Sequence, residues 1–191
     1  VGTWGVNYTG IGLTGNQAGN YVLDSTSAAD KTVEGNSITA KALTVGNISK
    51  VYDGTAEAKL TLDNLIGLVD GDKTSLSISE GVTANYTGEN AADFGAGKIV
   101  EYSGLTLGGE KSGNYTIAVN GTTTGNIDKR VLTAKNISKV YDGTDTATLH
   151  LSDLLGTDGL PGVVERDETY LDLTTSAATY GDKDAGIYNN L

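Results

Sequence analysis

The amino-acid sequence predicts an all-β protein in which small β-sandwich repeats of immunoglobulin-like type stack end to end into an elongated rod. Residues that favour strands, above all Thr and Val, alternate with turn-forming glycines, of which the sequence contains 27. Long stretches with the 3.6-residue hydrophobic period of a helix are missing. One motif also recurs unchanged, which is typical of repeat proteins.

The recurring motif sets the expected domain organisation. Asn47–Thr55 reads Asn-Ile-Ser-Lys-Val-Tyr-Asp-Gly-Thr, and the same residues return at Asn136–Thr144, 89 positions later. The offset holds on both sides of the motif until Gly156–Pro161, where the second copy carries six extra residues. Since neither end resembles a signal peptide, we expect the chain to be cut from a longer one. The expected segments are the C-terminal part of one repeat at 1–38, a complete repeat at 39–127 and the N-terminal part of the next at 128–191.

Alternating apolar residues predict the strands of a repeat. Apolar and polar residues alternate at period 2 around Leu60 and Leu62, around Leu76 and Ile78, and around Leu105 and Leu107. Asp63–Gly67 predicts a capped turn or one turn of helix. A repeat of about 90 residues with about seven such strands fits a small sandwich.

Three tyrosines have the sequence context of a tyrosine corner, in which the ring is buried and the hydroxyl bonds to nearby backbone. Each follows a glycine closely, in a small-Gly-x-Tyr or Gly-Asn-Tyr setting, and the three are Tyr21, Tyr115 and Tyr188. They support a sandwich without fixing its topology.

The Tyr-Asp-Gly element of the motif predicts a tight turn, because Gly accepts a positive φ and Asp bonds to nearby backbone N–H groups. An acid–base site would instead need a second carboxylate at a defined separation, and the spacing offers none. An isopeptide crosslink from the motif lysines stays open as an alternative. The residues expected to carry this structural role are Lys50, Tyr52, Asp53, Gly54, Lys139, Tyr141, Asp142 and Gly143.

No catalytic residue is predicted, and we expect the protein not to be an enzyme. His150 is the only histidine, and it lies on the solvent side of the alternation beside Leu149 and Leu151. A triad needs its three groups to converge in space, but the adjacent residues Ser152 and Asp153 point to opposite faces of a strand, so they do not both reach His150. No cofactor is expected, except that acidic loops could bind Ca²⁺ and stiffen a rod. The candidates are Asp70, Asp72, Asp182 and Asp184.

The net charge of −11 argues against nucleic acid as a partner, since such a surface repels a phosphate backbone. No run of about 18 apolar residues occurs, so no membrane insertion is expected.

The motif and its flanks resemble the YDG repeat module of large bacterial adhesins. Lys50–Thr55, its copy Lys139–Thr144 and the Gly-Asn-Tyr elements carry the resemblance. Such repeats are similar to those of filamentous-haemagglutinin-like exoproteins, which leave the cell by two-partner secretion, and of biofilm-matrix adhesins. The resemblance implies a secreted or cell-surface stalk that projects a binding region from a bacterium, with neighbouring repeats as its partners. The alternative is that the repeats themselves bind an exopolysaccharide or a host-cell glycan.

Overall fold

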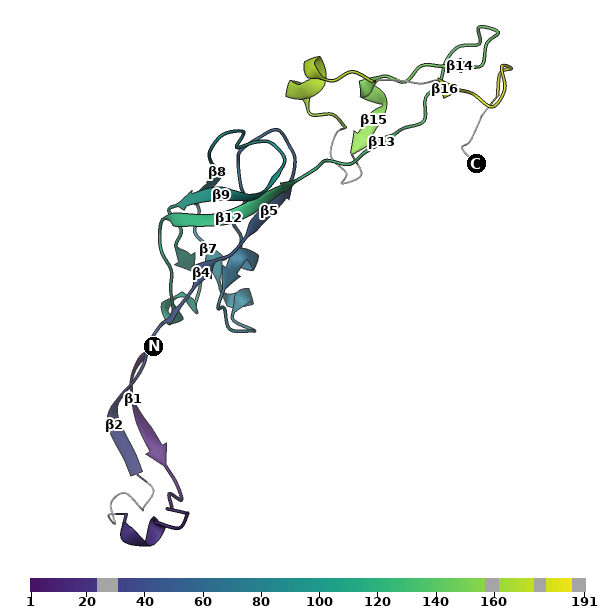
Figure 1. The fold of residues 1–191 in the computed structure, drawn as a ribbon. Coiled ribbons are helices and arrows are strands. Elements are labelled where there is room, and N and C mark those ends of the chain that lie inside the picture. The colour runs from purple at the N-terminus through teal and green to yellow at the C-terminus, as the bar shows by residue number, and fades with distance from the viewer. Residues whose placement is uncertain (24–30, 157–161, 174–177, 187–191) are drawn as a thin grey trace. The chain divides into compact units, whose positions relative to one another are not determined.

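A computed structural model describes residues 1–23, 31–156, 162–173 and 178–186 (Figure 1). These residues form short β-strands joined by turns and short 3₁₀ helices, so the all-β prediction is confirmed. Within the described ranges, no helix has the length and apolar composition that crossing a bilayer requires.

The strands vary in length from two to nine residues. In chain order they are β1 Gly2–Tyr8, β2 Lys31–Ile38, β3 Lys41–Ala42, β4 Thr44–Val45, β5 Ile48–Val51, β6 Leu65–Ile66, β7 Ser77–Ile78, β8 Thr83–Tyr86, β9 Gly95–Ser103, β10 Leu107–Gly108, β11 Tyr115–Thr116, β12 Gly121–Asp128, β13 Leu132–Ala134, β14 Thr146–Ala147, β15 Leu154–Gly156 and β16 Ala178–Thr179. The 3₁₀ helices are η1 Ala18–Asn20, η2 Leu62–Asn64, η3 Lys73–Ser75, η4 Ser112–Asn114, η5 Leu151–Asp153 and η6 Glu165–Tyr170.

The chain divides into two compact units, which we describe separately. Unit 1 comprises 1–46, 60–82 and 103–121, and unit 2 comprises 47–59, 83–102 and 122–191. The complete repeat expected at 39–127 therefore contributes residues to both units. The division of the chain into repeat segments at 1–38, 39–127 and 128–191 stays a prediction.

Unit 1 contains four two-stranded sheets. β1 pairs with β2, β4 with β6, and β7 with β10, all antiparallel. β3 pairs with β11 in parallel, and Tyr115 lies opposite Lys41. The buried side chains are Leu43, Leu65, Leu76, Leu105 and Tyr115.

Unit 2 is organised by a four-stranded sheet with the order β5-β12-β9-β8, in which the strands lie side by side in Figure 1. β5 and β12 run parallel, with Gly125 opposite Ile48 and Ile127 opposite Lys50. Two further pairs, β13 with β15 and β14 with β16, are antiparallel. The buried apolar residues are Ile48, Ala58, Ala84, Tyr86, Val100, Tyr102 and Ile127.

Tyr86 joins β8 to the opposite side of this sheet. Its hydroxyl lies 2.7 Å from the carbonyl oxygen of Ile48 and 2.9 Å from that of Asn126, so its single proton is shared between two carbonyl acceptors. The close approach requires a residue without a side chain at Gly125. A Cβ there would lie 2.1 Å from the Ile48 carbonyl oxygen and 2.8 Å from the Tyr86 ring.

The structure agrees with some of the strands expected from the alternating pattern and not with others. Residues around Leu76 to Ile78 and Leu105 to Leu107 contribute to β7 and β10, but the strand expected at Leu60 and Leu62 is wrong, because Leu62 begins η2. The Asn64 side chain explains the change, since its Oδ1 accepts the Thr61 N–H at 2.8 Å and caps a helical turn. The turn expected at 63–67 is thus present one residue early. Ten short strands, rather than about seven, occupy 41–128.

We predict that Gly125→Ala lowers the free energy of unfolding by about 2–3 kcal/mol, because β5 and Tyr86 must move to admit the methyl group. Gly113→Ala is the matched control, since nothing lies within 4 Å of the Cβ position at Gly113. Urea unfolding followed by circular dichroism measures both variants. Equal stabilities for the two would contradict the packing described for Gly125.

Candidate functional site

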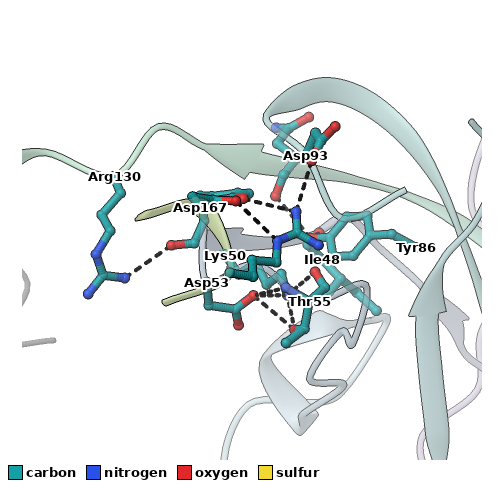
Figure 2. A network of polar contacts seen from close by, with 11 residues as sticks. Ile48, Lys50, Asp53, Thr55, Tyr86, Asp93, Arg130 and Asp167 are labelled. Atoms are coloured by element: carbon teal, nitrogen blue, oxygen red, sulfur yellow. Dashed lines mark hydrogen bonds and ion pairs between the residues drawn. The ribbon is translucent and has the colours of Figure 1, made fainter. Parts of the chain in front are cut away.

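The motif lysine and its two neighbours form a closed network that we call the Lys-Asp-Thr clip, made of Lys50, Asp53 and Thr55. The Lys50 Nζ donates to Asp53 Oδ1 at 2.7 Å, to the Thr55 carbonyl oxygen at 2.9 Å and to Thr55 Oγ1 at 2.9 Å. Asp53 Oδ1 also accepts the Thr55 N–H at 2.9 Å and its hydroxyl at 2.8 Å. Figure 2 shows the lysine reaching across this turn. All three ammonium protons are therefore used within the motif.

The same clip forms in the second copy from Lys139, Asp142 and Thr144. Lys139 Nζ lies 2.8 Å from Asp142 Oδ1, from the Thr144 carbonyl oxygen and from Thr144 Oγ1. Asp142 Oδ1 accepts the Thr144 N–H at 3.0 Å. Identical sequences thus produce nearly identical geometry in two parts of unit 2.

The glycine of each motif has the backbone conformation that the sequence predicted. Gly54 has φ +78° and Gly143 has φ +76°, a region that residues with a side chain rarely adopt. The turn lets the chain return so that the threonine faces the lysine. Each Tyr-Asp-Gly element therefore builds the turn on which the clip depends.

An aromatic ring completes each clip, and the sequence did not point to it. The Lys50 Nζ lies 5.7 Å from the centre of the Tyr86 ring, and the Lys139 Nζ lies 5.7 Å from that of Tyr180. The backbone of each tyrosine is held alike: Tyr86 N–H donates to Ala56 and Tyr180 N–H to Asp145. The only signal in the sequence for this shared role is that Tyr86 and Tyr180 lie 94 positions apart, close to the repeat length. They lie in a part of the repeat where the two copies otherwise match poorly.

The clip holds its aspartates in the ionised form. The Lys139 ammonium, followed by the Thr144 N–H and hydroxyl, lowers the pKa of Asp142 from 3.8 to about 2. At Asp53 the largest influence is partial burial, which acts to raise the pKa, but hydrogen bonds from Lys50 and Thr55 outweigh it and the pKa is lowered. Both copies therefore keep a charge pair at neutral pH.

Tyr52 and Arg130 connect the first motif copy to residues of the following repeat within unit 2. The Tyr52 hydroxyl donates to Asp167 Oδ2 at 2.6 Å and accepts from Arg166 Nη2 at 2.9 Å. Arg130 Nη1 donates to the Tyr52 carbonyl oxygen at 3.1 Å, while its Nε donates to the Gly162 carbonyl oxygen at 2.7 Å. Arg130, Asp167 and Asp93 surround the first clip in Figure 2.

These partners were missed from the sequence, because Arg130 and Arg166 have no counterpart of the same type in the first copy. The counterpart of Arg130 is Lys41, which cannot bind two carbonyl groups through a planar guanidinium. Tyr141, the copy of Tyr52, is an exposed residue.

The three expected tyrosine corners have different environments. Tyr115 is buried, accepts the Val69 N–H at 3.2 Å and donates to Asp72 Oδ2 at 2.6 Å. Tyr21 does not have the buried ring expected of it, since 72% of the residue is exposed. Tyr188 lies outside the described residues.

The calcium candidates do not converge. Across the described ranges, no three His, Cys, Asp or Glu side chains gather closely enough to hold a metal ion. Asp72 is engaged by Tyr115, and Asp182 Oδ1 accepts the Lys183 N–H at 2.6 Å. Asp184 pairs with the Lys183 ammonium at 3.0 Å. Asp70 is an exposed residue of a turn.

His150 is exposed, as the alternation predicted. The backbone N–H of His150 donates to Asp153 Oδ2 at 2.9 Å, and Asp153 Oδ1 also pairs with the Lys135 ammonium at 3.3 Å. The aspartate therefore caps a helical turn and does not orient an imidazole.

We predict that the clip makes stability depend on acid. The folded-state pKa of Asp142, about 2, lies below the roughly 3.9 of an unfolded Asp. Its charge therefore stabilises the fold fully above about pH 4, and this stabilisation is lost as the pH falls toward 2. In urea unfolding across this range, the double variant Asp53→Asn and Asp142→Asn should lose less stability than the parent. Parallel pH curves for the two proteins would contradict the assignment.

Comparison with known proteins places these residues in one family. The YDG domain profile matches residues 39–125 and 128–191. No curated protein and no solved structure matches the chain significantly. The two matched stretches together cover most of the sequence, and each contains one Lys-Asp-Thr clip. The chain therefore belongs to the YDG domain family.

Proposed function

We propose that the chain is a spacer segment of a secreted or cell-surface bacterial adhesin, of the filamentous-haemagglutinin-like or biofilm-matrix type. In this proposal its tandem, sandwich-like repeats form an elongated rod that carries a binding region away from the cell. The observation that best supports this proposal is that the Lys-Asp-Thr clip forms twice with the same contacts. The most faithfully repeated residues of the chain are thus engaged with its own backbone.

The chemistry of the clip supports a structural role over a catalytic one. The three protons of the Lys50 ammonium are bound by Asp53 and Thr55, and the Asp53 oxygen that accepts one of them also accepts two hydrogen bonds from Thr55. A general base or a nucleophile must have a lone pair directed at a substrate. The lowered pKa of Asp142 also makes that carboxylate a poorer base.

The contacts of Arg130 support stiffness where two repeats meet. The guanidinium bonds to a carbonyl group of the first motif, at Tyr52, and to one of the following repeat, at Gly162. The Tyr52 N–H also donates to Asp128 at 2.9 Å, which extends the β5–β12 pairing to the end of the repeat. A junction bonded from both sides bends less than a flexible linker.

We predict that proteins with one, two or three additional copies of residues 39–127, inserted after residue 127, lengthen by a constant step. The step is about 40 Å for strands that run along the axis. Small-angle X-ray scattering measures the maximum dimension. Growth with the square root of the copy number, as expected for flexible beads, would contradict a rod.

A second candidate function is that the repeats themselves bind glycans. A hollow of about 380 Å³ in unit 2 is lined by residues that include Tyr52, Phe94 and Leu132. Phe94 is an exposed ring, and the Lys129 ammonium lies 4.9 Å from its centre. Aromatic rings with adjacent polar groups can stack on sugars. The lengthened proteins on a glycan array separate the candidates, since a spacer gives no signal at any copy number and a binding repeat gives a signal that rises with it.

A further inference from the structure

The parallel pairing of β5 with β12 joins a strand from the beginning of the complete repeat to a strand from its end. Four positions pair between them, from Ile48 opposite Gly125 to Val51 opposite Asp128. Because the two strands are parallel, their N-terminal ends lie at one end of the pair and their C-terminal ends at the other. The chain enters β5 at its N-terminal end and leaves β12 at its C-terminal end, so it enters and leaves at opposite ends of the pair.

This arrangement determines how tension along the chain would load the β5–β12 pair. A pull on the preceding residues draws β5 toward its N-terminus, and a pull on the following residues draws β12 toward its C-terminus. The two strands must then slide past each other along their length. The hydrogen bonds between them cross the direction of sliding, so they share the load, whereas strands separated from one end lose these bonds one after another.

The Tyr86 hydroxyl holds both strands of the pair. It lies 2.7 Å from the carbonyl oxygen of Ile48 in β5 and 2.9 Å from that of Asn126 in β12. Tyr86 is only 2% exposed, and its backbone N–H donates to the Ala56 carbonyl oxygen at 2.7 Å, which fixes the residue in β8. Sliding of either strand would therefore separate the hydroxyl from at least one of its two acceptors.

Three further contacts hold the C-terminal end of the same pair. Lys50 lies in β5, so drawing this strand toward its N-terminus would pull the ammonium out of the Lys-Asp-Thr clip. The Tyr52 N–H donates to the Asp128 carbonyl oxygen at 2.9 Å, which continues the pairing beyond β5. Arg130, just after β12, donates from Nη1 to the Tyr52 carbonyl oxygen at 3.1 Å. The residues that would receive the load are thus bonded to one another.

Unit 1 contains a second parallel pair of the same kind. β3 lies near the start of the complete repeat and β11 lies toward its end, and Thr116 lies opposite Ala42. The Leu43 N–H donates to the Thr116 carbonyl oxygen at 2.8 Å and continues this pairing. Both parallel pairs of the repeat therefore connect an early strand to a late one.

We propose that β5 and β12 form a mechanical clamp, held together by the Tyr86 hydroxyl, through which the repeat bears tension along the chain. The side chains of the clamp are buried where the strands pair, since Ile48 is 1% and Ile127 is 0% exposed. A clamp adds to the role of a spacer, because resistance to forced unfolding is governed by the unfolding rate and not by length or stiffness. The inference concerns contacts within unit 2 and does not depend on the proposed adhesin function.

Pulling the full chain in two directions tests the clamp, because the chain contains no cysteine and handles can be attached at chosen positions. Asn47→Cys with Val131→Cys places the handles at opposite ends of the β5–β12 pair, and Asn47→Cys with Thr122→Cys places both at the same end. All three residues are exposed. With DNA handles in optical tweezers at one loading rate, the first variant should unfold at a several-fold higher force. Equal forces, or a higher force for the second variant, would overturn the proposal.

Tyr86→Phe in the first variant tests the part played by the hydroxyl, since it removes both carbonyl contacts and keeps the ring. The unfolding force in the sliding direction should fall. Tyr102→Phe is the matched control, because Tyr102 is also buried, at 8% exposed, but lies in β9 outside the β5–β12 pair. It should keep the force of the parent. An unchanged force for Tyr86→Phe, or an equal loss for the two substitutions, would contradict a clamp held by Tyr86.

Discussion

The ammonium group of the motif lysine is the constraint on which each repeat depends. A turn with a positive φ at Gly54 costs little for glycine, but it leaves polar groups of Asp53 and Thr55 facing one another. Lys50 satisfies three of these acceptors at once, while Tyr86 covers the charge from the sheet side. Lys50 lies in β5, the strand along which β12 pairs, so the clip anchors the turn that follows this strand.

The sequence predicted the local features of this arrangement well. The turn at Asp53 and Gly54, the exposed position of His150 and the all-β class all follow from residue types and spacing within a few positions. The clip partner Thr55 lay inside the identical motif as well. These features were predictable because their causes are short-range: a glycine that accepts positive φ, and a carboxylate that accepts adjacent N–H groups.

Longer-range features could not be predicted in the same way. Tyr86 packs on Gly125 and Ile48, and no periodicity in one strand identifies a ring that inserts from another. Leu60 and Leu62 alternate like a strand, but the Asn64 side chain caps a helical turn at that point and overrides the alternation. Arg130 and Arg166 act through guanidinium geometry that their counterparts lack. The Tyr115 hydroxyl is held by Val69 and Asp72, which lie far from it in sequence, so the Gly-Asn-Tyr element that Tyr21 and Tyr115 share does not by itself determine burial.

The central claim is that the motif lysine is structural, and thermal and urea unfolding of Lys50→Met measure it most directly. Methionine keeps much of the side-chain volume and removes the three donors, so the free energy of unfolding should fall by about 2–3 kcal/mol. Lys59→Met is the control, since Lys59 is exposed and lies outside the clip, and its effect should stay within about 0.5 kcal/mol. Equal effects of the two substitutions would contradict the account.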